Sequence, residues 1–292
     1  MTHKAGFVSI LGLPNVGKST LMNVLVGEKL SVITNKVQTT RHRIKGIVSG
    51  ENFQIIFSDT PGIIKPHYKL HEAMMHQVNG AIEDADLVIY IVEPGMKAID
   101  ETLETLSKIN PENLLLVINK VDTENQSGIQ NLVDTWQARL PDSVIIPVSA
   151  LYGFNTARVM DVIIEKLPEH PAYYAKDELT DKSYRFFVSE IIREKILMLY
   201  HKEIPYSVEV VIDEFKEEEN ITRIRALIYV TRESQRMIII GKQGKAVKQL
   251  GIEARKDIET FLNKKVYLEI SVKVDKNWRD SDQALRRFGY EL

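Results

Sequence analysis

The stretch GLPNVGKS, residues 12–19, has the residue types and the spacing to bind a phosphate chain. It fits the pattern G-x-x-x-x-G-K-[ST], and it stands between a strand-like apolar run and a helical pattern, where a phosphate-binding loop belongs. The glycines would let backbone N–H groups surround a phosphate, the Lys18 ammonium would reach the outer phosphates, and the Ser19 hydroxyl would bind Mg²⁺. The residues predicted to bind nucleotide here are Gly12, Asn15, Val16, Gly17, Lys18, Ser19 and Thr20.

A second motif, DTPG at residues 59–62, follows a strand-like run and could complete the phosphate end of the site. The Asp59 carboxylate would face the Mg²⁺, and the Gly62 N–H would reach a terminal phosphate. Taken alone, DTPG is equally typical of a plain β-turn.

Two later motifs carry the signal for a base. In NKVD, residues 119–122, the two Asp122 oxygens match the N1–H and 2-amino donors of guanine, whereas adenine has an acceptor at N1 and nothing at C2. SAL, residues 149–151, would supply the Ala150 N–H to the guanine carbonyl. The motifs favour GTP over ATP, and the residues predicted at the base are Asn119, Lys120, Asp122, Ser149, Ala150 and Leu151.

The elements that must position these motifs alternate along the chain. From Phe7 to about Leu167, short apolar runs alternate with amphipathic stretches, which predicts an α/β domain with a mostly parallel sheet covered by helices. The runs HRIKGIVS and FQIIFSD are separated only by GEN, so they should form an antiparallel hairpin. Residues 168–182 contain two prolines and no helical period, and we interpret them as a linker between domains 1–167 and 183–292.

The second half has a different element order. A helix over about 184–201, two long strands around the turn KEEEN, two helices split by GKQG and a last strand, VYLEISVKV, predict an α+β domain. The glutamates of KEEEN are typical of a solvated hairpin tip rather than a metal site.

With TTR at residues 39–41, five motifs stand in the order GLPNVGKS, TTR, DTPG, NKVD and SAL. Residues 6–167 thereby resemble the translation-factor-related class of Ras-like GTPases. The resemblance implies that Thr40 closes on Mg²⁺ together with Ser19 and Asp59, although a threonine pair in a polar loop is also ordinary loop filler. The residues assigned to catalysis are Lys18, Thr40, Gly62 and Asn15.

An isoleucine follows DTPG, at the position where Ras carries the glutamine that orients the attacking water. The Ile63 side chain has no donor or acceptor and cannot do this. In similar GTPases with an apolar residue here, a phosphate-loop asparagine helps to hold a monovalent cation, so the resemblance implies K⁺ at Asn15, with Thr39 as a further ligand. A role of Asn15 in capping its own loop is an equal alternative.

The GKQG turn lies in a basic stretch, with seven basic and two acidic residues from Arg232 to Lys256. G-x-x-G is often a mere helix-to-helix turn, but glycines also let a backbone approach sugar-phosphate. The element order around it resembles the bacterial (type II) KH domain, which binds single-stranded RNA or DNA. Trp278 and Arg279 could stack on bases, although packing is the commoner role of such a tryptophan. The residues predicted to bind RNA are Gly241, Lys242, Gln243, Gly244, Lys245, Lys248, Trp278 and Arg279.

The pairing of these two modules resembles the Era family over almost the whole chain. The resemblance implies a GTP-controlled switch, using GTP, GDP and Mg²⁺, that binds the 3′ end of 16S-type ribosomal RNA and assists assembly of the small ribosomal subunit and maturation of its RNA. The alternatives are an RNA-anchoring protein whose nucleotide site is mainly structural, and an RNA-remodelling ATPase, which NKVD disfavours.

Composition agrees with an intracellular protein. There is no cysteine among the 292 residues, no apolar run of the roughly 18 residues needed to span a membrane, and no recognisable signal peptide. Net charge is –5 over residues 1–180 and +3 over residues 181–292, which hints at nucleic acid binding by the second half. We expect a cytoplasmic monomer, with peripheral association at the inner face of the cell membrane left open. His71, Glu72 and His76 have the wrong spacing for a zinc hydrolase.

Overall fold

Contacts within the chain divide it into two units. The computed structural model describes residues 2–96 and 99–292, with side chains given outside residues 97–101. The first unit contains residues 1–33, 40–65 and 74–181, and the second contains residues 34–39, 66–73 and 182–292. The units are described separately below.

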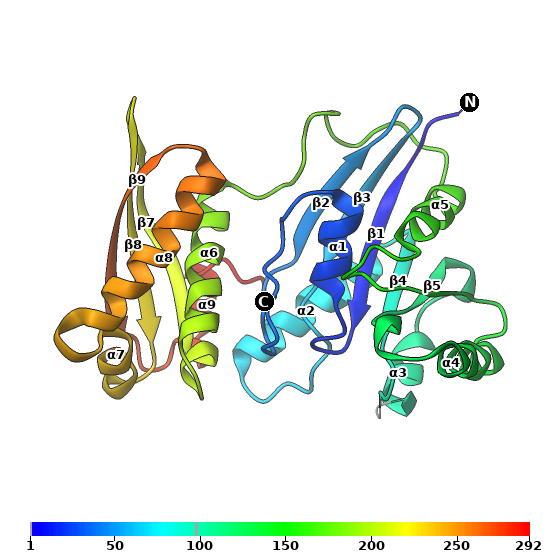
Figure 1. Cartoon of the computed structure of the whole chain (residues 1–292), viewed down its shortest axis with the longest axis horizontal. Helices are drawn as coiled ribbons and strands as arrows, with labels where there is room; N and C mark the ends of the chain where they lie inside the picture. Colours follow the sequence, from blue (N-terminus) through cyan, green and yellow to red (C-terminus); the bar gives the residue numbers. More distant parts are fainter. Residues whose placement is uncertain (1, 97–98) are drawn as a thin grey trace. The chain divides into compact units, whose positions relative to one another are not determined.

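The first sheet has six strands in the order β2-β3-β1-β4-β5-β6, and only β2 runs antiparallel to its neighbour (Figure 1). The mostly parallel sheet and the β2–β3 hairpin are therefore confirmed. Every residue of β4 and β5 is buried, because parallel strands in the middle of such a sheet are covered on both faces. The strands are β1 (Lys4–Gly12), β2 (Ile44–Ser49), β3 (Phe53–Asp59), β4 (Leu87–Val92), β5 (Leu114–Ile118) and β6 (Val144–Pro147).

Helices connect the parallel strands, since a parallel pair needs a long crossover. The helices of this part of the chain are α1 (Lys18–Val26), α2 (Lys69–Glu83), α3 (Ile99–Leu106), α4 (Gln126–Arg139) and α5 (Thr156–Lys166), with short 3-10 turns at Pro111–Asn113 and Val121–Thr123.

The segment predicted as a linker is bound along the first unit through residue 181. The Ala5 N–H donates to the Pro168 carbonyl (3.1 Å), and the N–H groups of Tyr173 and Tyr174 both donate to Gln54 Oε1. Farther along, the Ile47 N–H of edge strand β2 donates to the Leu179 carbonyl (2.8 Å). The linker thus covers part of an exposed strand edge.

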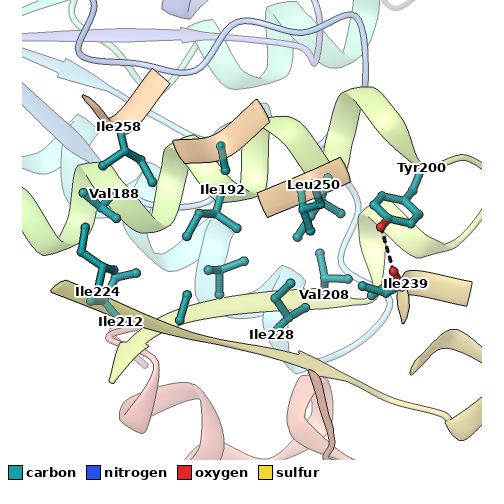
Figure 2. Packing of buried hydrophobic residues seen from close by; sticks show 14 of the residues in the cluster. Val188, Ile192, Tyr200, Val208, Ile212, Ile224, Ile228, Ile239, Leu250 and Ile258 are labelled. Atoms are coloured by element: carbon teal, nitrogen blue, oxygen red, sulfur yellow. Dashed lines mark hydrogen bonds between the residues drawn. The ribbon is translucent and has the colours of Figure 1, made fainter. Parts of the chain in front are cut away.

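The second sheet has three strands, with β7 antiparallel and β9 parallel to the central β8. Helices α6 and α8 pack on one face of it, where Val188, Ile192, Leu250 and Ile258 meet the strand side chains (Figure 2). The predicted order of helix, two strands, two helices and strand is confirmed. The elements are α6 (Tyr184–Leu199), β7 (Val208–Glu217), β8 (Ile221–Val230), α7 (Glu233–Ile240), α8 (Lys245–Leu262), β9 (Lys265–Val274) and α9 (Asp282–Arg287), with 3-10 turns at Ile204–Tyr206, Lys242–Gly244 and Trp278–Asp280.

No helix among residues 2–96 and 99–292 is both long and apolar enough to cross a membrane.

Candidate functional site

The phosphate loop joins the end of β1 to the start of α1, which begins at Lys18. Gly17 has φ +98°, and a Cβ there would lie 2.2 Å from Asn119 Nδ2, so only glycine fits. The Lys18 ammonium is buried and donates to the carbonyls of Gly12 (3.2 Å) and Leu13 (2.8 Å). A helix N-terminus and a buried ammonium therefore converge on one point, as phosphate binding requires.

Burial lowers the pKa of Lys18 to about 8, and the nearby Asp59 carboxylate opposes this shift only in part. Burial likewise raises the pKa of Asp59. Both shifts reflect the loss of water around a charge, which a negative phosphate chain and a cation would offset.

Three oxygen ligands meet beside Lys18. Ser19 Oγ donates to Asp59 Oδ2 (2.7 Å) and lies 2.9 Å from Thr40 Oγ1, which in turn donates to Asp59 Oδ2 (3.3 Å). The second carboxylate oxygen, Asp59 Oδ1, is buried with no hydrogen-bond partner in the described chain. Hydroxyl and carboxylate oxygens are the ligands that Mg²⁺ prefers, and an unpaired buried carboxylate oxygen fits a cation. The donor set predicted for Mg²⁺ is thus gathered at one place.

DTPG is anchored against the phosphate loop. The Thr60 hydroxyl donates to the Ile10 carbonyl (2.8 Å), and the Ile63 N–H donates to the Gly12 carbonyl (3.1 Å). A Cβ on Gly62 would lie 2.9 Å from Pro14 Cα, which shows how closely the two loops approach. The Ile63 side chain is partly buried and packs on the apolar cluster around Leu11. It has no donor or acceptor with which to orient a water.

Asn119 ties the phosphate loop to the SAL segment. The side chain is buried, its Nδ2 donates to the Val16 carbonyl (2.8 Å), and its Oδ1 accepts from the Ala150 N–H (2.9 Å). The Ala150 N–H that we predicted for the guanine carbonyl is bonded to Asn119 here, and its contact with the base stays a prediction.

The carboxylate predicted to select guanine is oriented by its neighbour. The Ser149 hydroxyl donates to Asp122 Oδ1 (2.5 Å), and Asp122 itself is exposed at the surface. Leu151 is 70% exposed beside these residues, where an apolar side chain could cover a base.

Lys120 is held by two partners, one of which the sequence did not reveal. Its Nζ donates to the Asn15 carbonyl (2.6 Å) and forms an ion pair with Glu93, the residue after β4. The ion pair fixes the Lys120 side chain across the base end of the site. Glu93 has no motif around it, and only its place at the carboxyl end of a parallel strand could have indicated a role.

The two residues predicted to hold K⁺ differ in their surroundings. Asn15 is exposed and has φ +67°, a conformation that asparagine tolerates better than most residues. The Thr39 hydroxyl is engaged within its own loop, with the Lys36 carbonyl and the Thr34 hydroxyl. A hydroxyl has one proton and two lone pairs, so Thr39 could keep its bond to the Lys36 carbonyl while a lone pair binds a cation.

In the second unit, the GKQG turn separates α7 from α8. Gly241 has φ +71°, and a Cβ there would lie 2.6 Å from the Ala246 Cβ, so the turn needs glycine at this position. Gln243 also has positive φ, +54°. The predicted RNA-binding side chains at the turn are all exposed: Lys242, Gln243, Lys245 and Lys248.

The structure corrects the prediction for Trp278. Its side chain is fully buried, and its ring packs edge-on against Phe288 at 5.7 Å between centroids. A base cannot stack on it, because the ring is buried and packs against Phe288, which follows α9 near the C-terminus. Packing, the commoner role, is the one observed. The Arg279 guanidinium lies over the Tyr68 ring, 4.9 Å from its centroid.

Comparison with known proteins identifies both modules. Residues 7–120 match the family described as 50S ribosome-binding GTPase, and residues 203–279 match the KH domain. The second match spans the GKQG turn.

Relatives match this chain over almost its whole length. GTPase Era of Syntrophus aciditrophicus (strain SB) is 44% identical over 98% of this chain and 95% of its own. A chloroplastic GTPase ERA-like protein of Oryza sativa subsp. japonica is 46% identical over 99% of this chain and 70% of its own.

Solved structures agree over the same length. A variant of Aquifex aeolicus Era bound to GDP and AlF4⁻ superposes with a TM-score of 0.94 at 38% identity, covering 99% of this chain and 100% of that one. A structure of Era with MgGDPNP and nucleotides 1506–1542 of 16S ribosomal RNA gives the same TM-score, identity and coverage.

Proposed function

The chain belongs to the Era family of GTPases, and we propose that its GTP cycle controls binding to the 3′ end of small-subunit ribosomal RNA during assembly of that subunit. It is a GTPase, with a GTPase module that matches over residues 7–120 and a KH domain that matches over residues 203–279. Since its proposed partner is a ribosomal RNA, we propose a cytoplasmic location.

The strongest support for ribosomal RNA as the partner comes from a solved structure of a relative. The relative that carries nucleotides 1506–1542 of 16S ribosomal RNA matches 99% of this chain at 38% identity, and that RNA belongs to the small subunit. The exposed Lys242 and Gln243 at the GKQG turn offer a cation and an amide where a sugar-phosphate backbone could approach.

For hydrolysis, Mg²⁺ would bind at Ser19, Thr40 and Asp59 and would offset the negative charge of the outer phosphates. The Lys18 ammonium would turn from the Gly12 and Leu13 carbonyls toward those phosphates. The Gly62 N–H, held against the phosphate loop, would bind the terminal phosphate. These groups would position the phosphates and offset their negative charge. Positioning and electrostatic stabilisation account for most of the catalysis of phosphoryl transfer.

Ile63 leaves the attacking water without a side chain to orient it, and we propose K⁺ at Asn15 as the compensating charge. Hydrolysis should be about tenfold faster in K⁺ than in Na⁺ at equal ionic strength, the size of effect expected for a modest charge contribution to the barrier. The rate of phosphate release measures this. The difference should vanish in Asn15→Ala, and equal rates in both salts would remove the cation from the mechanism.

The RNA site is tested by charge reversal at the GKQG turn. Lys242→Asp with Gln243→Asp should weaken binding of a 16S 3′-terminal RNA at least about tenfold, because two negative charges then face the phosphates. GTP hydrolysis without RNA should stay unchanged. Lys265→Asp is the matched control, because this exposed lysine of the second unit lies beyond the end of α8 that is far from the turn. Unchanged RNA affinity in the double variant would place the RNA elsewhere.

A further inference from the structure

The loop between α1 and β2 carries TTR and is called the first switch below. Arg43 lies three residues after Thr40, where this loop enters β2. Its side chain is only 16% exposed. No nucleotide motif includes it, yet it contacts both β3, which carries Asp59, and α2.

One contact of Arg43 is to the strand that carries Asp59. Arg43 Nε donates to the Ser58 hydroxyl (3.0 Å), and Ser58 is fully buried directly before Asp59. The guanidinium is therefore fixed within one residue of the carboxylate predicted to bind Mg²⁺. Arg43 Nη2 is buried and has no hydrogen-bond partner among the described residues. The bonds of Nε and Nη1 therefore hold the guanidinium in place.

Two more contacts of Arg43 are to α2, the helix that follows DTPG, and to the residue just after it. The Arg43 backbone N–H donates to Gln77 Oε1 (2.6 Å), and Gln77 is a buried side chain of α2. Arg43 Nη1 forms an ion pair at 2.6 Å with Asp84, the residue after α2 ends. Asp84 is 60% exposed, so this ion pair should contribute less than the two part-buried hydrogen bonds.

We infer that Arg43 is a positioning residue that ties the exit of the first switch to β3 and to α2, and so sets where Thr40 meets Asp59. A segment of three residues spans at most about 10 Å, so anchoring Arg43 narrows the positions open to Thr40. A movement of α2 must also shift Arg43 through Gln77 and Asp84. The inference rests on the proposed Mg²⁺ site.

The alternative is a purely structural role, since β2 is an edge strand and Arg43 could simply hold it to the sheet. The two roles differ in what they predict for nucleotides. Closure of Thr40 on Mg²⁺ and the terminal phosphate matters for GTP, whereas a loosened edge strand would weaken GTP and GDP binding alike.

The test uses the full chain with Arg43→Gln, and with Ser58→Ala and Asp84→Asn as milder changes. In Arg43→Gln, the Mg²⁺ concentration for half-maximal hydrolysis should rise about tenfold and kcat should fall, the size expected on losing a hydrogen bond to a charged group. GDP affinity should stay within about twofold, because GDP lacks the phosphate on which Thr40 closes. The effects should decrease in the order Arg43→Gln, Ser58→Ala, Asp84→Asn, and Arg43→Lys should restore part of the loss.

Arg139→Gln, an exposed arginine at the end of α4, is the matched control and should behave as wild type. If Arg43→Gln matches this control, or if GTP and GDP affinities fall together with the melting temperature, the inference is wrong. Hydrolysis by the wild-type protein that needs no Mg²⁺ would instead overturn the proposed metal site, and the two failures are therefore distinguishable.

Discussion

At the scale of residues, the site is a set of charges held away from water. Lys18 and Asp59 are both buried. The pKa of Lys18 is lowered and that of Asp59 is raised, so for each group the cost of removing its charge from water exceeds the attraction between the two charges. Ser19, Thr40 and Asp59 already lie in contact, so little rearrangement is needed to hold a cation. Lys18 is thus placed to bind a negative phosphate, and the oxygens of Ser19, Thr40 and Asp59 are placed to bind a cation.

The lowered pKa of Lys18 predicts that nucleotide binding depends on pH. Its pKa is about 8, and a bound phosphate chain raises it, so binding takes up a proton wherever Lys18 is neutral beforehand. For GDP we expect uptake of about a quarter of a proton at pH 7.5 and about nine-tenths at pH 9, with affinity falling as pH rises through 8. Calorimetry in buffers of different ionisation enthalpy measures this.

The matched control for this experiment is Lys108→Met, which removes an exposed lysine and should leave proton uptake unchanged. Uptake that does not grow between these two pH values would show that Lys18 is already charged throughout.

At the scale of elements, the sequence predicted the order of strands and helices and the ends of strands where the motifs lie. Hydrophobic periodicity and turn residues are local signals that a sequence shows directly. The continuous apolar runs of β4 and β5 are typical of buried parallel strands. Contacts between distant residues were not predictable. Nothing local indicated that Glu93 would hold Lys120, that Arg43 would contact α2, or that Trp278 would be covered by the C-terminal segment.

One such contact joins the end of α6 to the end of α7. The Tyr200 hydroxyl donates to the Ile239 carbonyl (2.9 Å), two residues before Gly241 (Figure 2). Tyr200→Phe should lower the free energy of unfolding of the second unit by about 1–2 kcal/mol, because a buried carbonyl loses its partner. Urea denaturation measures the change. Tyr184→Phe, at a 61% exposed position, should cost almost nothing, and an equal loss in both variants would argue against the bond.

At the scale of the whole molecule, the chain joins a GTPase module that matches over residues 7–120 to a KH domain that matches over residues 203–279. The charge divides in the same way, with the excess of basic residues after residue 180. A GTPase that only anchored RNA would need no communication between these parts. Control of RNA binding by the nucleotide is the property that separates a switch from an anchor.

The affinity for a 16S 3′-terminal RNA, measured with a non-hydrolysable GTP analogue and with GDP side by side, tests this claim most directly. We predict that the two dissociation constants differ by at least about fivefold, the lower end of typical coupling between two sites. Equal affinities, with RNA binding still lost in Lys242→Asp with Gln243→Asp, would contradict the switch and leave an RNA anchor with a structural nucleotide site.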